Sequence, residues 1–349
     1  MSAGLVFTEE QQALAESARE VVEAQWRLDQ LRQEGWDDVR GRQAAMGELG
    51  WTALAVPEAL DGLDLGLPEA AVLFEALGRH LVPTALLSTT VLAGPALYGH
   101  PEHLAGLLNG TRLFALAAQE TGTRSQPGWG ATITGDALTG TKTWVLDGAD
   151  GDAFVVTATR DGERVLALVD ASDATVTPQT AMDHRTHATV SFDAAPCQLL
   201  DGGEALLDLC LDQARVLLAA EMLGGMQAAL ERTLAWLHER HQFGVPIGSF
   251  QALQHRMADC FMDVELARSV VLAAARAAPD ELPQLACLAQ ARCSEAFRHV
   301  AGEALQLHGG IGMTEEHDIG LFLKRAKVCQ ALLGDAAWHR RRWARLRGY

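Results

Sequence analysis

Apolar positions recur at three- and four-residue spacing over most of the first 110 residues, and again from Gly203 to the C-terminus. That spacing places the apolar side chains on one face of an α-helix. Thr8 and Gln11 form a capping box, which opens the first of these helices. The predicted helices span residues 8–26, 43–50, 68–80, 86–98 and 102–108 in the first part, and 203–241, 249–277, 283–308, 315–332 and 335–347 in the last part.

Short apolar or alternating runs separate the two helical parts and predict strands at 113–118, 131–134, 141–146, 153–159, 165–169 and 189–192. The turn dipeptides Gly135-Asp136, Asp147-Gly148 and Asp161-Gly162 lie between them. We therefore expect an α+β protein that is mainly α. Its predicted parts are an N-terminal helical domain (1–110), a small antiparallel β domain (111–202) and a C-terminal helical bundle (203–349).

The charge balance narrows the classes of partner. With 28 basic and 45 acidic residues the chain carries a net charge of −17, which disfavours nucleic acid and anionic membranes as partners. No apolar run is long enough to span a membrane, and Glu9 and Glu10 precede any signal-like segment, so we expect a cytoplasmic protein. Six cysteines without a Cys-x-x-Cys spacing predict reduced thiols.

Several common site motifs are missing from the sequence. The pairs His184 with His187 and His238 with His241 lack a companion set of cysteines or carboxylates, so we predict no metal. No Gly-x-Ser-x-Gly elbow occurs, which argues against that class of hydrolase. No Gly-x-Gly-x-x-Gly follows a strand, so a Rossmann unit is not expected.

The segment from His238 to Asp259 carries the strongest signal. Gly244, Pro246 and Gly248 require a turn between two helices, and Ser249 is the predicted N-cap of the second helix. Its residue pattern, Arg-x-Gln-Phe-Gly-x-Pro-Ile-Gly-x-Phe-Gln over 240–251, resembles the flavin-binding segment of acyl-CoA dehydrogenases. Gln-Leu-His-Gly-Gly-Ile-Gly over 306–312 is similar to the family's second flavin loop, and residues 7–12 resemble the start of its chains.

The resemblance implies bound FAD and assigns residues to it. Arg240 would meet the pyrophosphate, a contact that suits a guanidinium, with Gln251 beside it. In this family such residues reach the flavin of a neighbouring subunit. The second loop would approach the same cofactor through Gln306, His308, Gly309 and Gly310.

Two further segments resemble family motifs within the predicted β domain. Residues 119–125, from Gln119 to Ser125, match a flavin loop, and 142–148 match the segment whose tryptophan, here Trp144, forms a flat wall for the flavin ring. Gln119 and Leu146 replace two threonines that would contact the flavin. Without the resemblance, Trp144 would be interpreted as a core tryptophan.

The implied reaction is α,β-dehydrogenation of an acyl thioester, in which a carboxylate takes the α proton and hydride passes to flavin N5. The family's two usual base positions match Leu333 and Ala214 here, and neither residue can accept a proton. Asp335 and Glu221 are the possible substitutes. Their alternative roles are a helix N-cap for Asp335 and a hydrogen-bonded helix residue for Glu221.

The resulting hypothesis is an FAD-dependent acyl-CoA dehydrogenase acting on an acyl-CoA or related thioester, with an electron-transfer flavoprotein or similar acceptor. It would form a homo-oligomer or a heterotetramer with a related subunit. One alternative is a non-catalytic subunit that completes the flavin site of a partner, and the missing base favours it. A second alternative is a flavin oxidase or another dehydrogenase that does not act on thioesters.

Overall fold

The structure is a computed structural model and describes residues 8–122 and 125–349. Phe7 and positions 123–124 of two predicted motifs therefore lie outside the described residues. The N-terminal part is helical, as predicted, and Thr8 and Gln11 form the predicted capping box. Its elements are α1 (Glu9–Gln25), α2 (Leu28–Glu34), α3 (Val39–Glu48), η1 (Trp51–Ala53), η2 (Glu58–Leu60), α4 (Leu67–Arg79), η3 (Leu87–Ala93), η4 (Gly94–Leu97) and α5 (Pro101–Leu108).

One predicted helix of this part, over 86–98, differs in kind. The chain forms a π-helix, η3, followed by the 3-10 turn η4. Pro95 has no backbone N–H to continue an α-helical ladder, which explains the change of geometry at Gly94 and Pro95. Thr89 of η3 hydrogen-bonds the carbonyl of Phe114, so this segment is tied to the first strand.

The middle part is an eight-stranded sheet in the order β6-β7-β3-β2-β4-β5-β8, with β1 also paired to β4. Its strands are β1 (Phe114–Ala117), β2 (Thr132–Thr134), β3 (Ala137–Leu146), β4 (Ala153–Arg160), β5 (Glu163–Asp170), β6 (Thr175–Thr180), β7 (Thr186–Pro196) and β8 (Gln198–Leu200), with η5 (Ala171–Asp173) before β6. The antiparallel prediction holds for most pairs, but β1 and β2 run parallel to β4. β4 is buried along most of its length, as a strand that is covered on both faces requires.

The last part is again helical. It comprises α6 (Gly203–Glu239), the short hairpin β9 (His241–Gln242) and β10 (Val245–Pro246), η6 (Ile247–Ser249), α7 (Gln251–Ala275), α8 (Leu282–His308), η7 (Gly309–Met313), α9 (Ile319–Ala331) and α10 (Ala336–Leu346). The prediction that Ser249 is the N-cap of α7 is wrong, because Phe250 occupies that position. The Ser249 hydroxyl instead donates to the carbonyl of Pro246 and closes η6.

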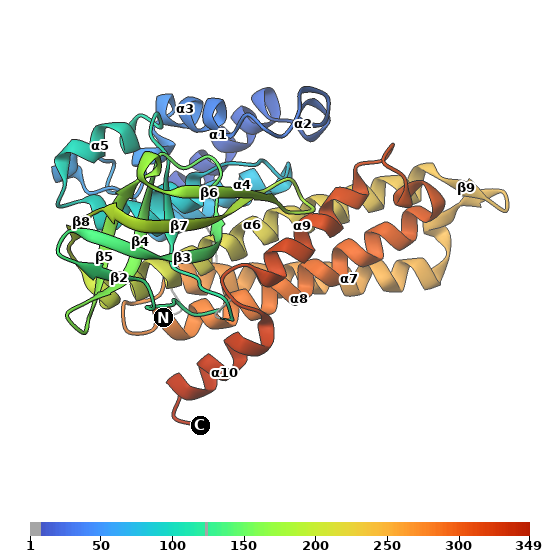
Figure 1. The fold of residues 1–349 in the computed structure, drawn as a ribbon. Helices are drawn as coiled ribbons and strands as arrows, with labels where there is room; N and C mark the ends of the chain where they lie inside the picture. The colour runs from blue at the N-terminus through green and yellow to red at the C-terminus, as the bar shows by residue number, and fades with distance from the viewer. Residues whose placement is uncertain (1–7, 123–124) are drawn as a thin grey trace.

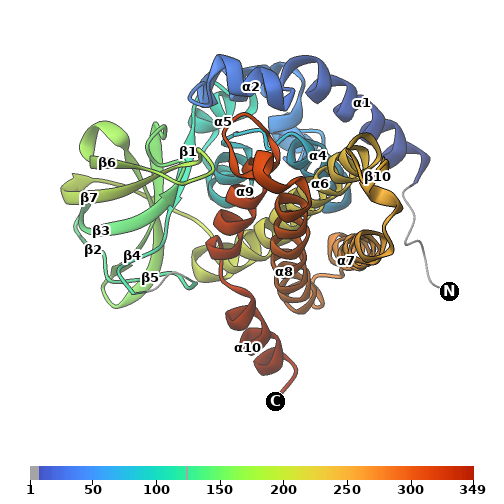
Figure 2. The ribbon, with the colours of Figure 1, turned by 90° about the vertical axis from the view of Figure 1, so that its right-hand side faces the viewer.

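α6 organises the molecule, since it packs against α4, α7, α8, α9 and η3. It starts beside the sheet and ends at the β9–β10 hairpin, which lies at the opposite end of the helical bundle (Figure 1). Seen from the side, the sheet and the bundle form two bodies in contact, and α10 projects away from both (Figure 2). None of the described helices is long and apolar enough to cross a membrane.

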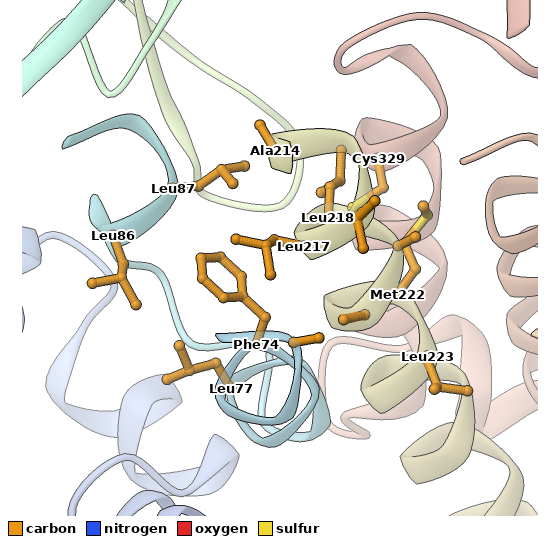
Figure 3. Packing of buried hydrophobic residues seen from close by; sticks show 14 of the residues in the cluster. Phe74, Leu77, Leu86, Leu87, Ala214, Leu217, Leu218, Met222, Leu223 and Cys329 are labelled. Carbon is orange, nitrogen blue, oxygen red and sulfur yellow. The ribbon is translucent and has the colours of Figure 1, made fainter. Parts of the chain in front are cut away.

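The core around α6 is built from apolar side chains of three elements. Phe74 and Leu77 of α4 and Leu86 and Leu87 at η3 pack beside α6 (Figure 3). The α6 residues of this cluster are Ala214, Leu217, Leu218, Met222 and Leu223, which are almost fully buried and lie around the helix rather than on one face. This packing fixes α6 relative to both the N-terminal helices and the sheet.

Candidate functional site

Trp144 lies in a bulge of β3 and faces outward from the sheet. Its φ of 55° is in the left-handed region, and the pairing with β7 shifts register between Lys142 and Val145. A bulge of this kind re-aims a side chain. Accordingly the indole is 46% exposed, and the alternative of a core tryptophan does not fit its environment.

The indole of Trp144 forms one wall of a pocket of about 240 Å³, which we call the Trp144 pocket. His187 stands edge-on to the indole, with ring centroids 6.1 Å apart. The remaining lining consists of Gln119 from the loop after β1, Ala181 and Met182 from the β6–β7 connection, and Lys327, Val328, Ala331 and Leu332 from α9 and its C-cap. A flat aromatic wall with mostly apolar surroundings suits a planar ring system.

Lys142 fixes the loop in front of this pocket. Its ammonium is fully buried and donates to Glu120 Oε1 (2.6 Å), the Gly128 carbonyl (2.8 Å) and Thr157 Oγ1 (2.9 Å). Burial lowers the pKa of the Lys142 ammonium, and the neighbouring carboxylate of Glu120 opposes this. The carbonyl of Gln119 also accepts from the backbone N–H of Thr143 (2.8 Å), so both ends of the loop contact β3 or β4.

A smaller pocket of about 40 Å³ adjoins the Trp144 pocket and contains Leu333, with Leu146, Ser125 and Arg215 around it. We call it the Leu333 pocket. Leu333 has a φ of 58° and is almost fully buried, and Ala214 is fully buried in the core. Among the described residues, none of the side chains lining the Trp144 pocket or the Leu333 pocket is a carboxylate.

Glu221, one of the two predicted substitute bases, belongs to a closed ring of four buried charges. Arg185 and Arg325 each contact both Glu221 and Asp183, and the Arg325 distances are 2.7 Å to Glu221 and 2.6 Å to Asp183. Burial disfavours the ionised form of Glu221, but the two guanidinium groups outweigh it and hold the pKa of this carboxyl below its usual value. A general base needs the opposite shift.

The four residues of this ring, which we call the charge ring, come from three elements. Asp183 and Arg185 lie between β6 and β7, Glu221 lies on α6, and Arg325 lies on α9. The β6–β7 connection and α9 are also the two elements that flank Trp144 in its pocket. The charge ring therefore joins the walls of the Trp144 pocket to the central helix.

Asp335, the other predicted substitute, caps α10. Its carboxylate accepts from the backbone N–H of Trp338 at 2.7 Å, and the residue is exposed. It does not line the Trp144 pocket or the Leu333 pocket. The structure thus gives both candidate carboxylates the structural roles that the sequence allowed as alternatives.

Arg240 and Gln251 lie at the other end of α6, together with the β9–β10 hairpin. Phe243 and Gly244 both have positive φ, at 56° and 81°, as a two-residue hairpin requires. Arg240 is the C-cap residue of α6 and Gln251 is the first residue of α7, and both side chains are exposed. Within the described part of the chain, the Arg240 guanidinium makes no ion pair.

The loop 306–310 lies at the same end. The ring of His308 stacks on Trp236, one turn before Arg240, with centroids 5.3 Å apart. Nδ1 of His308 donates to the Ala304 carbonyl at 2.7 Å, which fixes the ring. Gln306, Gly309 and Gly310 are exposed, and a Cβ atom at either glycine would meet nothing within 4 Å.

The predicted cofactor residues therefore form two separate groups. Arg215, at the edge of the Leu333 pocket, and Arg240 are on the same helix, and 25 residues at 1.5 Å rise place them about 37 Å apart. One group contains Gln119, Ser125 and Trp144, and the other contains Arg240, Gln251, Gln306, His308, Gly309 and Gly310. These groups cannot surround the same flavin ring within one chain.

Three polar residues near the Trp144 pocket were not predicted as site residues from the sequence, namely His187, Lys327 and Arg325. Arg325 and Glu221 are 104 positions apart, and no local pattern indicates their contact. In the sequence, His187 stands out only through its spacing from His184. Among the described residues, no group of three or more His, Cys, Asp or Glu side chains is placed to hold a metal ion.

Comparison with known proteins identifies the family. The model for the acyl-CoA dehydrogenase N-terminal domain matches residues 8–110, and that for the acyl-CoA dehydrogenase C-terminal domain matches residues 201–346. A curated relative, acyl-CoA dehydrogenase IpdE2 of Mycolicibacterium smegmatis, is 36% identical over 289 residues, which cover 82% of this chain and 81% of the relative.

Solved structures agree with this result. The Tcur3481-Tcur3483 steroid ACAD (G363A variant) superposes with a TM-score of 0.86 at 31% identity, covering 97% of both chains. The ChsE4-ChsE5 complex of Mycobacterium tuberculosis superposes with a TM-score of 0.89 at 28% identity, covering 98% of both chains. With the helical, sheet and helical parts in the same order along the whole length, this chain belongs to the acyl-CoA dehydrogenase family.

Proposed function

We propose that this chain is a subunit of an FAD-dependent acyl-CoA dehydrogenase that completes the flavin site of a neighbouring, related subunit and supplies no catalytic base of its own. The observation that carries this proposal is the lining of the Trp144 pocket and the Leu333 pocket. No described lining residue is a carboxylate, and Glu221 and Asp335 are both engaged elsewhere. Abstraction of the substrate's α proton would then fall to a carboxylate of the neighbouring subunit.

The residues at the C-terminal end of α6 fit the phosphate-bearing part of FAD. Arg240 offers an exposed guanidinium, in a protein whose net charge is −17, and such a cation is needed locally for a pyrophosphate. Gly309 and Gly310 leave open space where backbone can approach a ligand closely. When bound, the flavin would supply hydride acceptance at N5, while Arg240, Gln251 and Gln306 would hold its phosphates and polar chain.

Similar proteins support an assembly of two kinds of subunit. The ChsE4-ChsE5 complex and the Tcur3481-Tcur3483 enzyme are both named for two components, and the second is described as a steroid ACAD. By analogy, we infer an acyl-CoA thioester as the substrate of the assembly and an electron-transfer flavoprotein, or a similar carrier, as its electron acceptor.

The second candidate is a self-sufficient acyl-CoA dehydrogenase with an unusual base. Trp144 favours it, because the half-exposed indole beside a 240 Å³ pocket offers a wall for a flavin ring in this same chain. The two candidates differ in which residues of this chain hold the bound flavin.

Flavin content of two variants distinguishes the candidates. The chain would be tagged and purified with its native companions from the organism that encodes it, and FAD per chain would be measured for Arg240→Ala and Trp144→Ala. If the chain completes a partner's site, Arg240→Ala weakens FAD binding at least about thirtyfold, as loss of one partner of a buried charge contact does. Trp144→Ala then leaves the FAD content unchanged.

Arg341→Ala is the matched control, because it removes another exposed arginine from a different helix. Loss of FAD from Trp144→Ala would instead support the self-sufficient dehydrogenase. Full FAD retention in Arg240→Ala would contradict the assignment of the α6 end as a flavin contact.

A further inference from the structure

A second apolar space lies between α6 and the N-terminal helices. It has a volume of about 300 Å³ and is bounded by α4, by η1 and the segment after it, by η3 and η4, and by α6. We call it the α4–α6 cavity. Most of its lining is aliphatic or aromatic, including Trp51, Leu54, Phe74, Leu86 and Leu217.

This cavity is separate from the Trp144 pocket and the Leu333 pocket. It shares no lining residue with either. On α6 it contacts Gln213 and Leu217, whereas the Leu333 pocket contacts Leu211 and Arg215. Positions two residues apart point about 200° away from each other around an α-helix, so the cavity and the Leu333 pocket lie on opposite faces of α6.

Closely packed side chains fill the space between the cavity and the sheet. Figure 3 shows Leu217 next to Phe74, both of which line the cavity, with Leu87 and Ala214 beyond them. Leu87, Ala214 and Leu218 are almost fully buried. A ligand in the α4–α6 cavity would therefore not touch a ring placed on Trp144.

An opening to solvent is available on the outer side. Leu65, from the segment before α4, and Leu209 of α6 both line the cavity and remain 39% and 43% exposed. Ala55, also in the lining, is exposed. Apolar side chains that are both lining and exposed mark the mouth of a pocket rather than a sealed packing defect.

The polar groups of the lining restrict what the cavity can hold. None of its described lining residues carries a charge, which disfavours a carboxylate, a phosphate or coenzyme A as the occupant. The Thr52 and Thr90 hydroxyls already donate to the Leu108 and Leu86 carbonyls. Within the described residues, the Gln213 amide and the Tyr98 hydroxyl make no hydrogen bond.

The Tyr98 hydroxyl, whose pKa burial raises to about 12, can both donate and accept a hydrogen bond. Two uncommitted polar groups in an otherwise apolar cavity are the usual arrangement of a small-molecule site, where apolar walls supply affinity and a few polar atoms fix orientation. An engineered apolar cavity of about 150 Å³ holds benzene, so a cavity twice as large suits a two-ring skeleton.

We propose that the α4–α6 cavity binds an uncharged alicyclic molecule of about two fused rings carrying one hydroxyl or carbonyl, with Gln213 and Tyr98 contacting that oxygen. The site would be reached between Leu65 and Leu209, from the side of α6 that faces away from the Leu333 pocket. This proposal does not depend on the proposed function, because it concerns a different face of α6.

Calorimetric titration of the full chain with decahydro-2-naphthol tests the proposal. We expect saturable binding at one site per chain, and no binding of decahydro-2-naphthoic acid, which has a similar skeleton but carries a negative charge. Ala70→Phe, which places a phenyl ring in the cavity from α4, should weaken alcohol binding at least tenfold. Ala24→Phe adds the same ring on the exposed face of α1 and should leave binding unchanged.

Gln213→Leu provides a test that does not rely on filling the cavity. Loss of one hydrogen bond should weaken the alcohol about fivefold while leaving binding of decalin, the parent hydrocarbon, unchanged. Absence of saturable alcohol binding to the unmodified chain would overturn the proposal. Equal affinity of the unmodified chain and a folded Ala70→Phe variant would overturn it as well.

Discussion

The middle of α6 and its C-terminal end differ in how their polar residues are used. At the C-terminal end, Arg240 and Gln251 are exposed, and Arg240 has no ion-pair partner among the described residues. At the middle of the helix, Glu221 is almost fully buried together with Arg185 and Arg325, and these charges pair with one another. The first arrangement leaves polar groups available for a molecule outside the chain, whereas the second uses them to hold the chain together.

A position near a pocket is therefore not enough to make an acidic residue a catalytic base. Glu221 is close to the walls of the Trp144 pocket in the fold, yet its two arginine partners keep it ionised and occupied. Removing charge at these two places should therefore have different consequences, and stability measurements can test this at the charge ring.

Glu221→Gln should produce the largest loss of stability. It leaves two buried guanidinium groups with a single carboxylate, and breaking a buried ion pair in this way costs about 3–5 kcal/mol. Urea unfolding of the two proteins measures the difference. Glu231→Gln, on the same helix but in a partly exposed pair with Arg79, is the control and should cost at most about 1 kcal/mol. Similar losses in both variants would show that the charge ring is not a special stabilising feature.

Asp147→Asn should change how stability depends on pH. Burial raises the pKa of the Asp147 carboxyl to about 7, although a hydrogen bond from Ser88 (2.6 Å) and the charge of Arg185 oppose the shift. The folded protein then keeps a proton that the unfolded chain releases near pH 4. The stabilisation that the folded protein gains from keeping this proton is complete below about pH 4. It is lost as the pH rises toward about 7, at about 1.4 kcal/mol per pH unit.

The measurement for Asp147 is the difference in unfolding free energy between the variant and the unmodified chain at several pH values. Asparagine does not ionise, so the variant should gain relative stability from about pH 4 to about pH 7 and no more above that. A difference that stays flat over this range would mean that Asp147 is ionised in the folded protein at every pH tested.

Asp335→Ala should have the smallest effect. It removes the N-cap hydrogen bond to Trp338 and should cost about 1 kcal/mol of stability. Turnover by the purified assembly should fall no further in Asp335→Ala than in Asp335→Asn, which keeps a side chain that can cap the helix. If Asp335→Asn abolished turnover while leaving stability unchanged, Asp335 would act as a base and the assignment of both carboxylates to structural roles would fail.

The order of helical and strand-forming parts followed from local patterns, because helix faces, caps and turns depend on neighbours within a few residues. The capping box at Thr8 is an example, and it is confirmed in the structure. β6 was not predicted because it is a largely exposed edge strand, without the apolar alternation that marks a half-buried one. The N-cap at Ser249 was wrong by one residue, since η6 extends through it.

The candidate site was less accessible to sequence reasoning, because its decisive contacts are long-range. Family resemblance supplied the flavin residues at both ends of α6, but only the fold shows that they are far apart within one chain. Glu221 meets Arg185 and Arg325, which lie 36 and 104 positions away. No periodicity or spacing in the sequence encodes that meeting, so the structural role of Glu221 could be named only as an alternative.

The charge ring also constrains how this chain can evolve. Asp183, Arg185, Glu221 and Arg325 are interdependent, so a substitution at one of them is harmful unless a second compensates, a relation that geneticists call epistasis. The Leu333 side chain does not depend on charged partners in this way, because it is aliphatic and lies beside a small pocket. In this lineage a new acidic group could therefore arise at position 333 by single substitution more readily than Glu221 could be released from its partners.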